Sequence, residues 1–413
     1  MRILIINQPL NNRGDESAHK AFVRTLLRLL PDAYFSVLFV ESYSPDGIRQ
    51  FKVHDPRMAY VNLHPRSEFW RLAEQWINEG STEGWASDPS MQTFHAFYEV
   101  ADFVVCAPGG ICMGAFQDWW HLFYLRVAQF LEKPLVYYGR SFGPFPVTDA
   151  RSQRFKDESM ALLHYFSFLS IRDQQTEKIA QEIGGLTYSP TTDVAFLERP
   201  QVEIPQPVLD AIGNQPYMVF VPNYLLWHPM YKGKVQKETV LQFYSDIIDL
   251  ITAQEPQLRI VMLPQTFGGG TYETDDVFFF REIAAFKNDP RIIVVPDIYS
   301  SDVQQTIIAG ARFLIGARYH SVVFALNQNV PFIALNYEHK IRGLLTHLKK
   351  TDCMVDIMTA FDGDANRTQA LDAIRQLLPA IQPDPQAQTL AATLASSCIE
   401  DFVARLNRMN SAQ

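Results

Sequence analysis

The sequence predicts an α/β protein of two domains, each built on a parallel β-sheet. At 413 residues the chain is long for a single core, and two domains of roughly 200 residues each are the usual outcome. In both halves, short apolar runs alternate with segments in which apolar residues recur every three or four positions. This alternation is typical of parallel strands joined by right-handed helical crossovers.

The first half contains four short apolar runs that predict buried strands, at residues 3–6, 37–40, 103–106 and 135–138. Helical periodicity over 18–30 and 119–131 predicts helices between the strands. Residues 64–99 are rich in aromatic side chains and irregular, and helical insertions are one interpretation of them.

A proline-rich segment separates the halves, because prolines at 200, 205, 207 and 216 oppose both helix and strand. Beyond it the pattern restarts, with strands predicted at 218–221, 259–263, 292–295, 313–315 and 331–335 and helices at 237–253, 278–286, 302–310 and 321–328. Ser300 or Ser301 is expected to cap the helix at 302–310. The predicted boundaries are therefore a first domain over 1–198, a linker over 199–216, a second domain over 217–385 and a helical tail over 386–413, with a cleft between the domains.

Composition and charge exclude several classes of protein. A net charge of −9 and a pI near 5.6 argue against nucleic acid as a partner, because binding phosphates needs a dense field of Lys and Arg. The four cysteines form no C-x-x-C pair and no H-E-x-x-H is present, so we expect no disulfide framework and no required metal. The first residues read as a strand, not as a signal peptide, and no apolar run approaches the ~20 residues of a membrane span, so a cytoplasmic protein without an integral membrane segment is expected.

Arg318 and His320 lie on the turn between the strand at 313–315 and the helix at 321–328. In an open parallel sheet, ligands bind beyond the carboxyl ends of the strands, where helix N-termini favour anions. Arg offers a planar fork to carboxylate or phosphate, and His exchanges a proton near neutral pH. Lys340 follows the next strand and is placed to reach the same anion. The alternative is that Arg318 caps a neighbouring helix and that His320 and Lys340 are surface residues.

Candidate residues in the first half are less specific. Arg172 is a cation that follows the apolar stretch 165–171, although a surface pair with Asp173 would explain it equally well. Asp15 is expected at least to cap a helix, and functionally it would bind or deprotonate a hydroxyl of an acceptor. The pair Gly109-Gly110 would let a ligand approach the backbone closely, or it forms a simple tight turn.

Two further features of the first half have competing interpretations. Trp119 and Trp120 would stack on a sugar ring, with at least one of them expected in the core. Gly139-x-Ser141-x-Gly143 matches a hydrolase nucleophile elbow, but prolines follow it where a helix should begin. The Ser141 hydroxyl is therefore expected to satisfy loop backbone.

Taken in order, these motifs resemble the polysaccharide pyruvyl transferase family, over roughly residues 1–350. The resembling pieces are Asn12-x-Gly14-Asp15, Pro108-Gly109-Gly110, Gly139-x-Ser141-x-Gly143-Pro144, Ser170-x-Arg172-Asp173, Thr192-Asp193-Val194-Ala195-Phe196, Arg318-x-His320, Pro331, Tyr337 and Lys340. The resemblance implies two Rossmann-like domains facing across a cleft, as in GT-B folds. Arg140 departs from the family pattern, because many members carry glutamine there, and residues 64–99 have no counterpart.

The resemblance also implies an activity: transfer of a carboxyethylidene group from phosphoenolpyruvate to two hydroxyls of a sugar, with no cofactor and no metal. It implies that Arg172 and Arg318 bind the donor, that His320 is the acid/base residue, and that Tyr319 and Lys340 line the donor site in the second domain. The acceptor would lie on the first domain, near Asn12, Gly14, Asp15, Gly109 and Gly110. Free, nucleotide-linked and lipid-linked acceptors stay open, and the last would bring the protein transiently to the inner face of the membrane.

Other functions share this architecture, and fold alone does not separate them. A nucleotide-sugar-dependent GT-B glycosyltransferase would need a pocket for base and ribose, for which Glu338 is a weak candidate. A non-catalytic anion-binding protein would hold the donor without releasing phosphate. An esterase would use Ser141 as its nucleophile.

Overall fold

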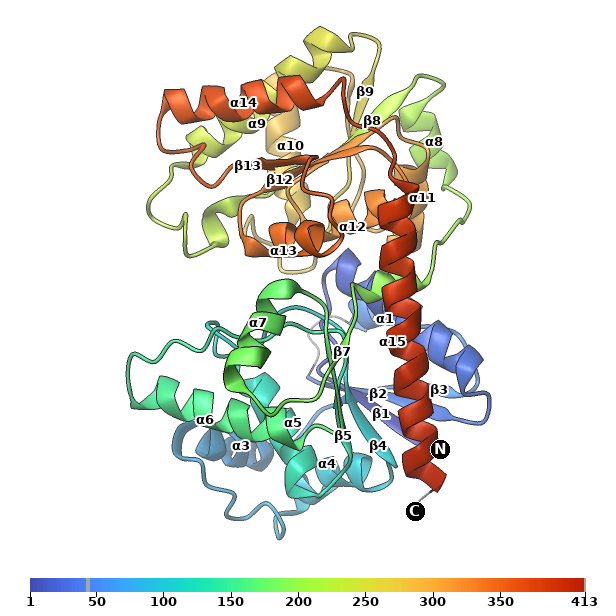
Figure 1. Ribbon diagram of the computed structural model, residues 1–413, viewed down its shortest axis with the longest axis vertical. Helices are drawn as coiled ribbons and strands as arrows, with labels where there is room; N and C mark the ends of the chain where they lie inside the picture. The colour runs from blue at the N-terminus through green and yellow to red at the C-terminus, as the bar shows by residue number, and fades with distance from the viewer. Residues whose placement is uncertain (42–44, 412–413) are drawn as a thin grey trace. The chain divides into compact units, whose positions relative to one another are not determined.

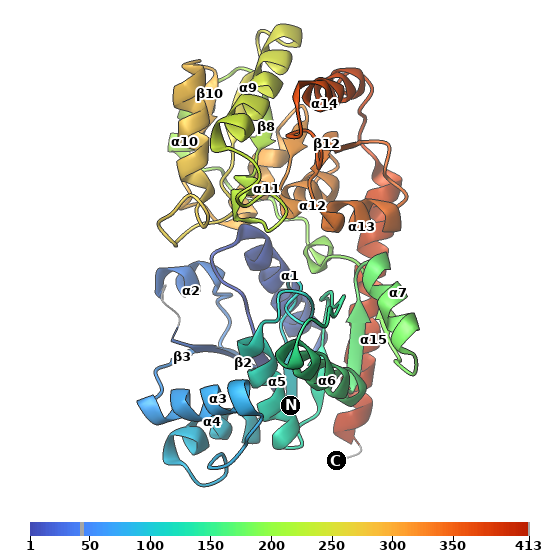
Figure 2. The ribbon, with the colours of Figure 1, turned by 90° about the vertical axis from the view of Figure 1, so that its left-hand side faces the viewer.

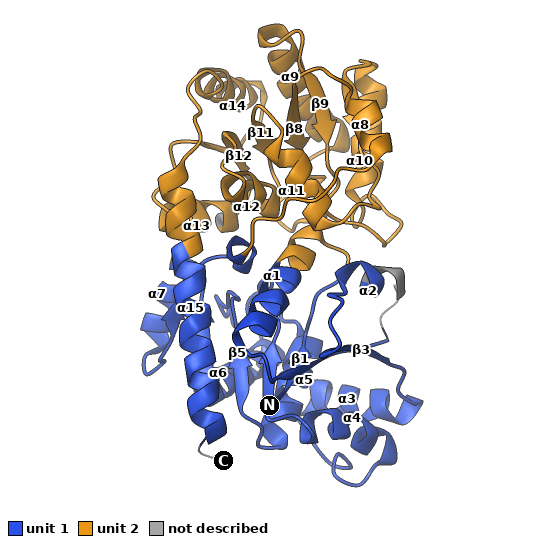
Figure 3. Cartoon of the chain, turned by 90° about the vertical axis from the view of Figure 1, so that its right-hand side faces the viewer, with its two compact units in different colours: residues 1–10, 18–197, 393–413 blue, residues 11–17, 198–392 orange. Residues whose placement is uncertain are grey.

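The computed structural model describes residues 1–41 and 45–411 and divides into two compact units (Figure 3). Unit 1 comprises residues 1–10, 18–197 and 393–413, and unit 2 comprises residues 11–17 and 198–392. Each unit contains a parallel sheet with helices packed on it (Figure 1). The predicted fold class, two parallel α/β domains, is confirmed.

The sheet of unit 1 has seven parallel strands in the order β3-β2-β1-β4-β5-β6-β7. They are β1 (Arg2–Ile6), β2 (Tyr34–Val40), β3 (Met58–Leu63), β4 (Phe103–Cys106), β5 (Leu135–Tyr137), β6 (Phe168–Ile171) and β7 (Ser189–Pro190). The order of strands along the chain reverses between β1 and β4, which are direct neighbours in register. In doubly wound sheets this is the place where a crevice opens at the carboxyl ends of the strands.

Alternate residues of β1 supply two separate cores: Leu4 and Ile6 face one layer of helices, and Ile3 and Ile5 face the other. The first layer comprises α3 (Ser67–Glu79), α4 (Pro89–Glu99), α5 (Trp119–Phe130), α6 (Ala150–Tyr165) and α7 (Gln174–Ile183). The second comprises α1 (Arg13–Leu29), α2 (Pro45–Phe51) and α15 (Pro385–Ser411). The aromatic-rich segment 64–99 is thus helical, and α3 and α4 lie together in unit 1 (Figure 2).

The sheet of unit 2 has six parallel strands in the order β10-β9-β8-β11-β12-β13. They are β8 (Tyr217–Val221), β9 (Arg259–Met262), β10 (Ile292–Val294), β11 (Leu314–Gly316), β12 (Phe332–Asn336) and β13 (Met354–Asp356). The helices are α8 (Gln206–Ile212), α9 (Lys237–Gln254), α10 (Asp276–Lys287), α11 (Ser301–Ala309), α12 (Tyr319–Asn327), α13 (His339–His347) and α14 (Asp364–Leu377). Ser300 caps α11 as predicted, because its hydroxyl accepts a hydrogen bond from the amide of Val303.

The observed division of the chain differs from the predicted boundaries in three places. Residues 11–17 belong to unit 2, the proposed linker 199–216 lies within unit 2 and carries α8, and the residues from 393 onward belong to unit 1. The strands β3, β7 and β13 were not predicted, because none of them is a continuous apolar run: β3 is a half-buried edge strand, β7 has two residues and β13 has three. Within the described residues, none of the helices combines the length and apolar character needed to cross a bilayer.

Candidate functional site

The carboxyl end of the unit 2 sheet gathers the residues on which the sequence prediction depends most. The strand order reverses between β8 and β11, so the loops after these strands leave the sheet in different directions. Arg318 directly precedes α12, in extended conformation, and His320 lies in the first turn of that helix. Arg318 thus occupies the predicted strand-to-helix turn, whereas His320 lies in the helix itself, which begins two residues earlier than predicted.

The Arg318 guanidinium is held by a buried carboxylate. Its Nη2 forms an ion pair with Asp276 and donates to the hydroxyl of Thr266 at 3.2 Å. Burial acts to lower the pKa of Arg318, but the charge of Asp276 outweighs it and the pKa is raised, so the side chain stays charged. Its Nε is buried and has no hydrogen-bond partner among the described residues. Asp276 and Thr266 therefore fix the guanidinium through Nη2, and the Nε–H is left for a ligand.

Three buried amide side chains lie at or just beyond the carboxyl ends of three strands in the same sheet. Asn223 follows β8, Gln265 follows β9 and Asn336 ends β12, and each is at most 1% exposed. In each of them the amide nitrogen has no hydrogen-bond partner among the described residues. A buried polar group without a partner costs about 1–3 kcal/mol, so such donors call for water or a ligand. Together with Arg318 they suit a ligand rich in acceptor oxygens.

His320 packs against Gly14, which the sequence prediction had assigned to the acceptor site of the first domain. A Cβ built on Gly14 would lie 1.8 Å from the imidazole Nδ1, so the ring lies directly on the glycine backbone. Residues 11–17 belong to unit 2, and the contact is internal to that unit. The motifs Asn12-x-Gly14-Asp15 and Arg318-x-His320, separated by about 300 positions in the sequence, thus form one site.

The segment carrying Gly14 is fixed in unit 2 by buried charges. Arg13 is fully buried, pairs with Glu16 at 2.6 Å and stacks on the Phe267 ring at 3.9 Å. Glu16 in turn accepts a hydrogen bond from the amide of Ser301, at the beginning of α11. Removing one partner of a buried pair typically costs 3–5 kcal/mol, so this network holds the position of Gly14 firmly.

Helix α1 starts earlier than the prediction for Asp15 requires. The helix begins at Arg13, and the Asn12 side chain accepts a hydrogen bond from the amide of Gly14 at 2.7 Å. Asp15 therefore lies in the first turn and does not cap the helix, whereas Asn12 occupies the capping position. The expectation that Asp15 caps this helix is wrong, because the capping residue, Asn12, lies three positions earlier.

Lys340 and Tyr319 complete the predicted set in unit 2. The Lys340 ammonium lies 3.3 Å from the Glu338 carboxylate, which also accepts a hydrogen bond from the Tyr337 hydroxyl. Burial, followed by the charge of Glu338, raises the pKa of Tyr337 well above its usual value, so its hydroxyl keeps its proton and donates. The Tyr319 ring meets the His320 ring edge-on at 5.0 Å. Sequence reasoning missed Asp276, which carries no motif, and gave Glu338 only a weak role.

Arg172 lies in unit 1, where its partners are other pieces of the family motifs. Its Nη1 lies 2.8 Å from the Asp193 carboxylate, and its Nε donates weakly to the Ser141 hydroxyl at 3.4 Å. The Ser141 hydroxyl itself donates to Asp173. A carboxylate, and not the predicted loop backbone, therefore satisfies Ser141. Because its proton goes to an aspartate and not to a histidine base, the hydrolase interpretation loses its geometry.

Unit 1 contains a cavity of about 300 Å³ at the carboxyl ends of β1 and β2. Its lining includes the aromatic residues Tyr98, Trp120 and Tyr124 and the polar residues Asn7, Glu41, Asp118, His121 and Arg140. Trp119 is in the core while Trp120 faces the cavity, so the expectation that at least one of them is buried is confirmed. Aromatic faces beside carboxylates are the usual surroundings of a bound sugar ring.

The two glycines predicted for the acceptor differ in their surroundings. A Cβ on Gly109 would lie 2.9 Å from Nη2 of Arg140, whereas Gly110 has open space around it. Gly109 therefore makes room for the arginine side chain, which donates to the carbonyls of Ala107 and Asn7. Neither glycine is among the residues that line the cavity.

Comparison with known proteins decides the family. A sequence model described as polysaccharide pyruvyl transferase matches residues 12–339, most of the chain. The chain belongs to the polysaccharide pyruvyl transferase family. Both segments of the contact between Gly14 and His320 fall inside the matched range.

A curated relative of this family member is the amylovoran biosynthesis protein AmsJ of Erwinia amylovora, 25% identical over 254 residues. The match covers 56% of this chain and 56% of AmsJ, so it spans about half of each protein.

Solved structures similar to this pyruvyl transferase family member share its fold. The UDP-GlcNAc 2-epimerase of Neisseria meningitidis, bound to UDP-GlcNAc, aligns with a TM-score of 0.58 and 9% identity, covering 99% of this chain and 100% of that one. The sucrose-phosphate synthase of Thermosynechococcus elongatus aligns with a TM-score of 0.55 and 12% identity over 100% and 98% of the two chains. At such identities the likeness shows a GT-B-like fold and carries no function.

Proposed function

We propose that this protein transfers a carboxyethylidene group from phosphoenolpyruvate to two hydroxyls of a sugar during polysaccharide biosynthesis. The observation that carries the proposal is that His320, two residues after Arg318, packs on the backbone of Gly14. An imidazole fixed beside an arginine with an open N–H suits an anionic donor that must be protonated. Membership of the family and the similarity to an amylovoran biosynthesis protein support a polysaccharide acceptor.

The donor would bind at the carboxyl end of the unit 2 sheet. Phosphoenolpyruvate offers phosphate and carboxylate oxygens, which a guanidinium and buried amides bind by charge-assisted hydrogen bonds. Arg318 and the amides of Asn223, Gln265 and Asn336 supply such donors. Lys340 and Tyr319 would line the site, with Lys340 turned toward the ligand from its Glu338 partner. Asp276 keeps Arg318 in place before the ligand arrives, which lowers the entropy lost on binding.

His320 would act as the acid/base residue. As an imidazolium it donates its proton to the methylene carbon of phosphoenolpyruvate, leaving an oxocarbenium ion at C2. One sugar hydroxyl adds to C2 and returns its proton to the imidazole. The C2–O bond to phosphate then breaks, the second hydroxyl closes the cyclic ketal, and its proton leaves on the phosphate. This sequence consumes one donor and one diol, releases one phosphate and needs no cofactor.

The acceptor would bind in the cavity of unit 1. Trp120 and Tyr124 offer faces for the C–H surface of a sugar ring, and Glu41 offers acceptors for its hydroxyls. A cavity of about 300 Å³ has room for one sugar residue, with the remainder of a glycan or a lipid carrier outside it. Arg172, which the resemblance gives to the donor, would act from unit 1 only if a ligand displaced part of its pairing with Asp193.

The experiment is incubation of the purified protein with phosphoenolpyruvate and a panel of free, nucleotide-linked and lipid-linked glycosides. Release of phosphate together with a mass gain of one carboxyethylidene group on the glycoside is the expected result. Binding of phosphoenolpyruvate without release of phosphate would identify an anion-binding protein instead. Thermal stabilisation by a nucleotide sugar but not by phosphoenolpyruvate would identify a glycosyltransferase.

A further inference from the structure

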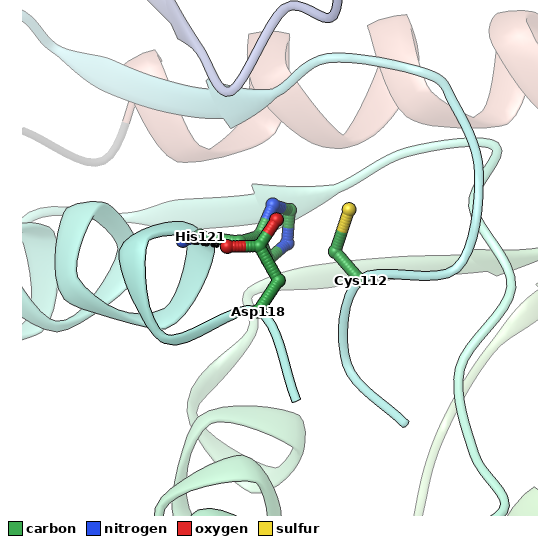
Figure 4. A group of neighbouring side chains, drawn as sticks. All are labelled: Cys112, Asp118 and His121. Carbon is green, nitrogen blue, oxygen red and sulfur yellow. Dashed lines mark hydrogen bonds between the residues drawn. The ribbon is translucent and has the colours of Figure 1, made fainter. Parts of the chain in front are cut away.

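Three potential metal ligands converge in the cavity of unit 1. Asp118 and His121 stand at the beginning of α5, and Cys112 lies on the preceding loop, facing them (Figure 4). Their ligand atoms all lie within 4.8 Å of one another, and all three residues line the cavity. The sequence predicted no metal because their spacing, C-x5-D-x2-H, matches none of the usual motifs.

We propose that Cys112, Asp118 and His121 bind one divalent metal ion of the zinc class. Sulfur, imidazole nitrogen and carboxylate oxygen are the ligands that zinc prefers. In a tetrahedral zinc site such atoms lie roughly 3.5 Å apart, given bonds of about 2.0–2.3 Å. Side-chain rotations that move the ligand atoms by about 1 Å would therefore close the present group around an ion. Three protein ligands leave a fourth position, which the cavity opens to water or to an oxygen of a bound ligand.

The local backbone brings two of these residues together before any metal arrives. The Asp118 carboxylate caps α5 by accepting a hydrogen bond from the amide of His121 at 3.0 Å. This places the carboxylate and the imidazole three residues apart at the beginning of one helix, a spacing at which helical side chains meet. Asn7 steadies the same turn, because its amide donates to the carbonyl of His121 at 3.1 Å.

The position of His121 suits a metal ligand. The side chain is buried and lies in the lining of the cavity, beside Cys112 and Asp118. Its Nε2 lies 3.8 Å from the sulfur of Cys106, and this contact helps to fix the orientation of the ring.

Arg140 sets the charge balance of the site. Its Nη1 lies 3.2 Å from the Cys112 sulfur, and its other N–H groups donate to backbone carbonyls, so the guanidinium is fixed. Cys112 would release its proton to solvent when the metal binds, after which the two anionic ligands carry two negative charges and Arg140 carries one positive charge. The remaining charge of −1 favours a divalent cation.

The test uses the full-length protein, freed of metal by a chelator and titrated with Co²⁺, which absorbs visibly in a tetrahedral thiolate site. One equivalent should produce ligand-field and thiolate charge-transfer bands, and Zn²⁺ should displace the Co²⁺. Cys112→Ser should abolish the charge-transfer band. Asp118→Asn should weaken binding at least about tenfold, and because Asn also caps helices, the fold should be retained.

The matched control is Cys353→Ser, a buried cysteine of unit 2 outside the group, which should leave the bands unchanged. Absence of the bands in the wild type, or bands that persist in Cys112→Ser, would overturn the proposal. Thermal melting of each variant separates loss of a ligand from loss of fold. The readout is independent of pyruvyl transfer, so the metal site and the proposed function stand or fall separately.

Discussion

Replacement of Gly14 by alanine tests the contact that joins the two halves of the proposed donor site. The new methyl group would lie 1.8 Å from Nδ1 and 1.9 Å from Cγ of His320. Ordinary contact begins at 3.4 Å, so the imidazole must retreat by about 1.6 Å (3.4 minus 1.8 Å). The backbone at Gly14 needs no positive φ, and alanine favours helices by up to about 1 kcal/mol, which offsets part of the strain. The protein should therefore fold.

The expected effect falls on catalysis. A displacement of about 1 Å at a reacting group lowers rates by about 10²-fold, and the complete loss of a general acid lowers them by about 10²–10⁴-fold. We expect kcat of Gly14→Ala to fall at least about 100-fold in a phosphate-release assay, with the melting temperature close to that of the wild type.

A double-mutant cycle provides the control. In a His320→Ala background there is no ring to displace, so adding Gly14→Ala should change the rate little further. If Gly14→Ala retains more than a third of wild-type kcat, or if the two substitutions act additively, the glycine does not work through His320 and the reasoning is wrong.

Four further results are expected. His320→Ala should lower turnover by about 10²–10⁴-fold while thermal stabilisation by phosphoenolpyruvate survives, and loss of that stabilisation would assign the residue to binding. Arg318→Ala should weaken donor binding by about 2–5 kcal/mol, measured as the rise in its KM and dissociation constant, and unchanged binding would remove Arg318 from the donor site. Trp120→Ala should raise KM for the glycoside but not for phosphoenolpyruvate, and the reverse pattern would contradict the acceptor cavity. Burial lowers the pKa of His19 to about 3 from 6.5, so between these pH values the unfolded chain binds more protons than the folded one. The free energy of unfolding should therefore fall as the pH drops from 6.5 toward 3, by up to about 1.4 kcal/mol per pH unit. His19→Gln should flatten that dependence in chemical denaturation, and an unchanged slope would show that other groups cause it.

The sequence was sufficient for the elements whose apolar pattern is continuous, and for the turn that carries Arg318 and His320. Buried strands such as β4 and β11 are runs of apolar residues, and the residues after them must emerge at the same edge of a parallel sheet. The short or half-buried strands β3 and β13 lack such a pattern, and local sequence does not mark them.

Long-range contacts were beyond a reading of local pattern. Nothing near Gly14 in the sequence indicates that its neighbour is His320, because the contact depends on residues 11–17 belonging to the second unit. The same holds for Asp276, which is one more acidic residue in a polar turn until the fold places it on Arg318. Cys112, Asp118 and His121 likewise acquire chemical meaning only when loop and helix meet.

The assignment of residues 11–17 to unit 2 has a practical consequence for work with fragments. A recombinant piece that starts at 198 and ends at 392 would match the visible boundaries of that unit, yet it would lack Arg13, which is fully buried there, and the glycine on which the histidine rests. In such a piece the Phe267 ring, which Arg13 covers in the full chain, would be exposed to solvent. Chimaeras between members of this family should therefore exchange the opening turn of α1 together with the C-terminal half, or exchange neither.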